Sequence, residues 1–174
     1  EDKIIKRAST TTDENSDLNL VFAKYKDKKI EVTFGRQKIN IGSERLIGSL
    51  EWAMTGRSFD GVRLKSGSWD AFAFKVGVSR PMPGGTRIVG TTYSGKCGLT
   101  SLILKNDNRT SVDNLTLSHF WQKQQGKWSF DAEGALQSGT VSGKDLSAWA
   151  GHGSATYSFS KSSKGVLELN AASG

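Results

Sequence analysis

The feature that most constrains the fold is a repeated alternation of apolar and polar residues over short runs that are separated by turn sequences. The run KWSFDAEGALQSG shows it most clearly, because Trp128, Phe130 and Leu136 alternate with polar residues. A period of two residues places successive side chains on opposite faces of a β-strand. We find about ten such runs, joined mostly as hairpins, and no helical period. The sequence therefore predicts an all-β, antiparallel, up-and-down (meander) fold.

Length and composition favour one domain. A chain of 174 residues can bury one hydrophobic core. Residues 1–17 are polar and charged, so we predict an N-terminal arm or loop there and a β-barrel segment over residues 18–174. Cys97 is the only cysteine, which excludes an intrachain disulfide.

The run KIEVTFGRQKINI predicts a strand whose apolar parity changes after Gly35. A β-bulge at Gly35 and Arg36 would exchange the two faces. With that bulge, Arg36 and Lys38 lie together on the polar face. The long connection that follows, residues 42–58, has no alternation, and its direction is open: it is either an external loop or an inward constriction.

Two further strands, FDGVRLKS and WDAFAFKVGVS, are joined by a short turn. Arg63 and Lys65 oppose Val62 and Leu64 in the first strand, and Lys75 opposes the phenylalanines of the second. We therefore predict that the polar faces of both strands carry cations.

Alternation alone leaves two interpretations open. In a soluble barrel or sandwich the apolar face is the core, whereas in an outer-membrane barrel it contacts lipid. Aromatic residues beside turns, such as Trp69 and Trp128, and an alternation of tight and long turns are typical of the second class. The formal net charge of +7 is compatible with an acidic partner in either case.

Two segments resemble a known family. The segment GRQKINIGSERLIGSLEWAMTGRSFDGVRL is similar to the hallmark segment of the alginate-export family of bacterial outer-membrane β-barrels. The segment KWSFDAEGALQSGTVSGKDLSAWAGHGSATYSFS, continuing to NAASG, resembles a second series of that family. Order and spacing agree across most of residues 29–174.

The resemblance implies a monomeric pore in the outer membrane, surrounded by its lipid, through which an anionic polysaccharide or a small acidic solute diffuses passively. It also implies that lumenal arginines and lysines select the anion. The expected pore-lining residues are Arg36, Lys38, Arg45, Arg57, Asp60, Arg63, Lys65, Lys75 and Glu133. Because about ten strands are too few for the wide barrel of the family, we expect a fragment or a shortened or engineered member.

Other classes of function find less support in the sequence. Asp131 and Glu133 face one side of a strand, which could suit a glycosidase, but we interpret them as lumenal carboxylates that balance cations. His119 and His152 lack a metal-binding spacing, and aromatic residues do not share a face with the cations. We expect no enzyme, metal, cofactor or nucleic-acid partner. The alternative function is a soluble β-barrel or sandwich that binds acidic ligands.

Overall fold

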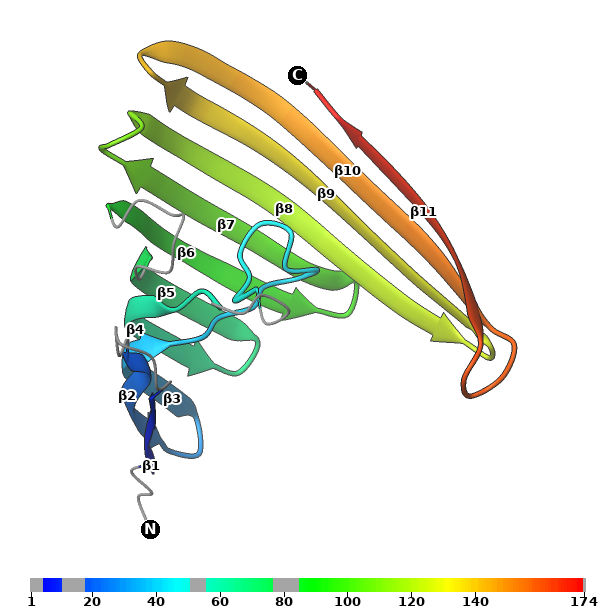
Figure 1. The fold of residues 1–174 in the computed structure, drawn as a ribbon, viewed down its shortest axis with the longest axis horizontal. Helices are drawn as coiled ribbons and strands as arrows, with labels where there is room; N and C mark the ends of the chain where they lie inside the picture. Colours follow the sequence, from blue (N-terminus) through cyan, green and yellow to red (C-terminus); the bar gives the residue numbers. More distant parts are fainter. Residues whose placement is uncertain (1–4, 11–17, 51–55, 77–84, 174) are drawn as a thin grey trace.

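The computed structural model describes residues 5–10, 18–50, 56–76 and 85–173. In these residues eleven strands form one antiparallel sheet, and each strand pairs with its neighbours in sequence (Figure 1). The strands are β1 (Ile5–Thr10), β2 (Leu18–Lys26), β3 (Ile30–Gln37), β4 (Phe59–Ser66), β5 (Trp69–Val76), β6 (Thr86–Gly95), β7 (Gly98–Asp107), β8 (Val112–Gln125), β9 (Trp128–Val141), β10 (Lys144–Ser158) and β11 (Lys164–Ala172). The predicted all-β meander is confirmed.

The N-terminal segment is one correction. We predicted a polar arm or loop for residues 1–17, but Ile5–Thr10 forms β1, which pairs with β2 from Ile5 opposite Lys24 onward. An edge strand is held by backbone hydrogen bonds to one neighbour and does not need the apolar alternation that we used to identify strands.

The sheet is long, curved and open within the described residues. In Figure 1, β1 and β11 lie at opposite ends of the strand order, and each pairs with one neighbour. The short turns after β2, β4, β6, β8 and β10 lie at one end of the strands, which we call the hairpin end. We call the other end, where residues 38–58 leave β3, the loop end. None of the described residues forms a helix long and apolar enough to cross a membrane.

The two faces of the sheet differ in chemistry. One face is covered in part by residues 38–50 and carries buried polar side chains, including Thr92, Ser101, Thr116 and Ser118; we call it the inward face. The opposite, outward face is apolar and exposed. Its large side chains include Val62, Leu64, Val89, Leu102, Leu104, Leu117, Leu136, Trp149, Leu167 and Leu169. An apolar outside and a polar inside are typical of an outer-membrane barrel.

Aromatic residues of the outward face gather near the hairpin end. Trp69 packs on Tyr93 with ring centroids 4.9 Å apart. Tyr157 contacts both Trp128, at 4.8 Å, and Phe159, at 4.9 Å. Rows of this kind anchor membrane barrels at the boundary between hydrocarbon and water.

The predicted β-bulge at Gly35 and Arg36 is absent. β3 pairs with β4 without a shift, so Gly35 lies opposite Gly61 and Arg36 opposite Asp60. Both glycines have positive φ, +117° for Gly35 and +159° for Gly61. A Cβ atom would lie 2.4 Å from the Val21 carbonyl oxygen at Gly35 and 2.0 Å from that of Ala73 at Gly61. Glycine therefore serves close strand approach here and does not exchange the faces.

Candidate functional site

The candidate site forms where the connection after β3 turns onto the inward face. We call this connection, residues 38–58, the inward loop; its described parts are residues 38–50 and 56–58. Ile39, Ile41 and Ile47 are almost fully buried and pack against Phe59 and the apolar residues of β5 to β7. This small lumenal core explains why the loop folds inward, since three isoleucines would otherwise stay in water.

Hydrogen bonds within the loop fix its course. Ile41 and Ile47 form an isolated antiparallel bridge, in which the Ile41 amide donates to the Ile47 carbonyl at 3.0 Å. Ser49 is fully buried; its hydroxyl accepts from the Ile39 amide at 3.1 Å, and its own amide donates to Asn40 Oδ1 at 2.8 Å. The described part of the loop thus folds onto the inward face, which decides between the two directions that the sequence left open.

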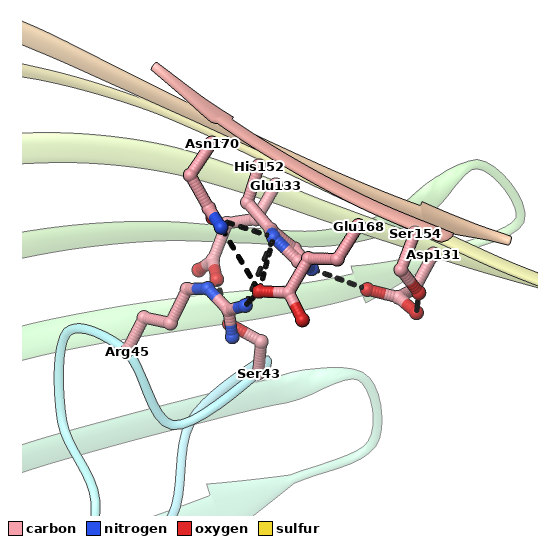
Figure 2. A network of polar contacts seen from close by, with 8 residues as sticks. All are labelled: Ser43, Arg45, Asp131, Glu133, His152, Ser154, Glu168 and Asn170. Carbon is pink, nitrogen blue, oxygen red and sulfur yellow. Dashed lines mark hydrogen bonds and ion pairs between the residues drawn. The ribbon is translucent and has the colours of Figure 1, made fainter. Parts of the chain in front are cut away.

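The tip of the loop reaches strands far away in the sequence. Figure 2 shows Ser43 and Arg45 directed from the loop toward β9, β10 and β11. Arg45 Nη2 donates to Glu168 Oε1 at 2.7 Å and lies 2.9 Å from His152 Nδ1. The Ser43 hydroxyl donates to Glu133 Oε2. Two charge-assisted contacts therefore hold the loop against the opposite part of the sheet.

His152 is the centre of a polar cluster on the inward face (Figure 2). Its Nε2 lies 2.9 Å from Asp131 Oδ1, which can only accept, so we assign the proton to Nε2. Its Nδ1 has a donor, Arg45, and an acceptor, Asn170 Oδ1 at 2.8 Å. The ring nitrogens of His152 therefore contact Arg45 of the loop, Asp131 of β9 and Asn170 of β11. These contacts connect the loop to the strands.

The geometry does not support nucleophilic catalysis at this cluster. Ser154 donates its hydroxyl hydrogen to Asp131 Oδ2, and Asp131 separates it from His152. A serine nucleophile needs a base that takes its proton directly. Within the described ranges, no group of three or more His, Cys, Asp or Glu side chains could hold a metal ion.

A pocket of about 290 Å³ opens beside this cluster. Its polar side is formed by Arg45, Glu133, His152 and Asn170. Its other side consists of Leu46 and small residues of β9 to β11, mainly alanines. The small side chains leave free space beside the tip of the inward loop.

A second pocket, of about 250 Å³, lies between the loop and β4 to β7. Arg63 and Lys65 line it, together with Asp70. Arg63 Nη2 donates to Asp70 Oδ2 at 2.5 Å, and Lys65 lies opposite Asp70 in the strand register. Lys65 also lies opposite Glu31 of β3, which forms an ion pair with Lys24 at 2.7 Å. Arg63, Lys65 and Lys24 thus lie beside two carboxylates, which leaves positive charge on this side of the inward face.

Five predicted pore-lining residues lie on the inward side. Arg63, Lys65 and Glu133 face inward from their strands, and Arg45 belongs to the inward loop. Arg57 is half buried in the loop; its amide donates to the Ser49 carbonyl at 2.7 Å, and burial lowers the pKa of its guanidinium. Lys38, at the start of the loop, is exposed.

Three predicted pore-lining residues face the other way. Without the bulge, Arg36 shares the outward face with Phe34, and Asp60 opposite it faces outward too. Arg36 Nε donates to Asp60 Oδ1 at 2.7 Å, so the two residues form an ion pair on the outward face. Lys75 is next to Asp60 in register and also points outward. The pore-lining prediction is wrong for these three.

The reason lies in β5. Its register pairs Arg63 with Phe72 and Val62 with Ala73, so the phenylalanines face inward beneath the loop. The outward positions of β5 are Trp69, Ala71, Ala73 and Lys75. The apolar side of β5 is thus the lumenal core, and the parity argument that assumed an outward apolar side fails in this strand.

The cluster around His152 was missed at the sequence level. Asp131, His152, Glu168 and Asn170 come from three strands and show no motif. The signal that could have found them is the tight turn after Val141, because a turn at Ser142 and Gly143 sets Glu133 opposite His152. Register across one hairpin thus carries more information here than spacing along one strand.

Arg45→Gln should loosen the inward loop. The variant loses the ion pair with Glu168, and because both side chains are about half exposed, we expect a modest loss of protection. Hydrogen exchange of the Ile41 and Ile47 amides should then be roughly fivefold faster. Arg45→Lys, which keeps the charge, should restore part of the protection. Unchanged exchange in Arg45→Gln would show that the isoleucines alone hold the loop.

Comparisons with known proteins agree with this fold. A family model described as alginate export matches residues 2–87. Pseudomonas aeruginosa OccK2 (OpdF), solved in complex with glucuronate, is 15% identical with a TM-score of 0.60, over 91% of this chain and 49% of OccK2. The outer membrane protein OpdK of the same organism is 15% identical with a TM-score of 0.57, over 88% of this chain and 48% of OpdK.

OpdK has also been solved with vanillate, at 14% identity and the same TM-score of 0.57. The chain spans about half the length of these solved structures. At such low identity the likeness shows a shared β-barrel fold. No curated protein matches the chain.

Proposed function

We propose that this chain, of which residues 2–87 match a family model described as alginate export, forms part of the wall and the constriction of a monomeric outer-membrane pore for passive transport of acidic solutes. The observation that carries the proposal is the inward loop. A segment with Arg45 at its tip crosses a polar inward face, while the apolar face points outward. A lipid-facing wall with a wet interior and a narrowing is the architecture of a pore.

Cations on the inward side favour acidic solutes. Arg63 and Lys65 line one pocket and Arg45 lines the other. Guanidinium and ammonium groups attract carboxylates, and arginine can bind them with two parallel hydrogen bonds. Glucuronate and vanillate, bound in the two similar structures, each carry a carboxylate. The solute class that we propose is therefore a uronate, either free or as part of an anionic polysaccharide.

Uptake into proteoliposomes tests this function. Vesicles that contain the protein should admit glucuronate faster than glucose, which has a similar size and no charge. Equal rates would contradict the selectivity for acids, and entry of neither solute would contradict transport itself.

Lys65→Gln should reduce anion selectivity. A unit charge close to the path of an ion contributes about 1 kcal/mol in water, so the permeability ratio of anion to cation should fall roughly fivefold at low salt. Lys123→Gln is the matched control, because Lys123 lies opposite Phe130 on the outward face. Reversal potentials in a salt gradient measure both variants. An unchanged ratio in Lys65→Gln would remove this residue from the conduction path.

A further inference from the structure

The outward face carries one row of charged residues near the loop end. In register, Arg36 lies opposite Asp60, Asp60 opposite Lys75, and Lys75 opposite Arg87. Each of these four residues is the second residue from the loop end of its strand. The row therefore crosses β3 to β6 at the end opposite the outward aromatic pair of Trp69 and Tyr93.

The surface below this row is apolar. On the same strands Val62 is 40% exposed, Leu64 42% and Val89 51%. In a membrane barrel such side chains contact lipid tails. The charged row thus borders the apolar band where tails give way to head groups.

Within the row, the positive charges are only partly balanced. Arg36 donates to both oxygens of Asp60, from Nε at 2.7 Å and from Nη2 at 2.9 Å, so this carboxylate is occupied. In the part of the chain that the structure describes, neither Lys75 nor Arg87 forms an ion pair with a carboxylate. Both side chains are exposed. A surplus of two positive charges therefore faces outward.

The spacing of these two cations suits a single phosphate. Residues directly opposite on antiparallel strands have Cβ atoms about 5 Å apart. An arginine can bind a phosphate through two parallel hydrogen bonds, and a lysine adds a point charge. A cation on the lipid face is strongly destabilising at the bilayer midplane and is tolerated at the interface, where an anionic head group stabilises it.

We propose that Lys75 and Arg87 bind a phosphate group of a phosphorylated membrane lipid, with the acyl chains of that lipid lying over Val62, Leu64 and Val89. The two cations adjoin the apolar band, so a lipid can contact both the cations and the band. A free phosphate ion could contact only the cations, and we therefore favour a lipid. This site is on the opposite face from the transport path and does not depend on which solute crosses it.

The test compares two lipids that differ only in phosphate. The protein in nanodiscs is incubated with diphosphorylated lipid A or with its dephosphorylated form, and retained lipid is measured by native mass spectrometry. We expect the phosphorylated form to bind more tightly. Lys75→Gln with Arg87→Gln should weaken its binding by on the order of 30-fold, since each cation near a membrane surface contributes about 1 kcal/mol.

Controls separate the explanations. Lys123→Gln removes an outward cation near the hairpin end and should leave binding unchanged. If the double variant fails to fold, Lys75→Arg with Arg87→Lys keeps both charges and should retain the lipid. The proposal is overturned if both lipids bind equally, if Lys123→Gln loses as much affinity as the double variant, or if inorganic phosphate displaces the lipid at comparable concentration, which would indicate a free-phosphate site. The uptake assay with glucuronate reads out the transport function separately.

Discussion

Leu136→Arg is expected to destabilise the folded protein in a bilayer by about 2–4 kcal/mol. Leu136 is 62% exposed and lies in an outward row with Trp149 and Leu117, far from both ends of β9. A guanidinium there would enter the hydrocarbon layer, where it loses its hydration. Equilibrium unfolding by urea in lipid vesicles measures the effect.

The matched control is Ala148→Arg. Gln137 follows Leu136 in the sequence and faces inward. Ala148 lies opposite Gln137 and therefore faces inward too. A charge there meets a wet interior, so we expect a change within about 0.5 kcal/mol. If Leu136→Arg were equally mild, the outward face would be in water, as the alternative of a soluble acidic-ligand binder requires.

Phe59→Ala should cost about 3–5 kcal/mol, because it empties the centre of the lumenal core. Phe59 is 1% exposed and packs on Phe74 with ring centroids 5.8 Å apart. The same core holds Ile39 and Ile41 of the inward loop. We therefore expect lower stability together with a loop that proteases cleave more readily, measured by urea unfolding and limited proteolysis.

Phe34→Ala serves as the comparison for this second prediction. Phe34 is 67% exposed on the outward face, so its loss removes contact with lipid but none with the loop. Its variant should keep the protease resistance of the loop even if stability falls. Equal cleavage of both variants would mean that the loop is not anchored by the lumenal core.

Much of the fold could be predicted from alternation and turns. The hairpins from β2 onward follow the runs that the sequence separates by short polar turns, such as the one between Ser66 and Trp69. Nearest-neighbour pairing then follows from chain connectivity. β1 escaped prediction because pairing at an edge depends on the backbone, which leaves no pattern in the side chains.

The facing of the strands was harder to predict, for a physical reason. Alternation identifies the two faces of a strand, but it does not tell whether lipid, water or another segment of the chain contacts each face. In β4 Val62 and Leu64 face outward, whereas in β5 Phe72 and Phe74 face the loop. The difference depends on the isoleucines of the inward loop, which no local pattern ties to β5. We therefore predicted that Lys75 lines the lumen, whereas it faces outward.

The candidate site was half predictable. Arg45 was expected on the inward side from the family resemblance, and there it forms an ion pair with Glu168. The identity of that partner was hidden, since it lies on β11. His152 looked isolated along the chain, although its carboxylate and amide neighbours are one strand away on either side.

The inward loop also sets an order of assembly. Nearly all strand pairs join neighbours in sequence, so hairpins can form one after another as the chain is delivered to the membrane. The contacts of the loop tip are different, because Ser43 meets Glu133 across 90 residues and Arg45 meets Glu168 across 123. The loop tip is therefore fixed only after β9, β10 and β11 have formed, so the loop stays loosely held while these strands are still being added.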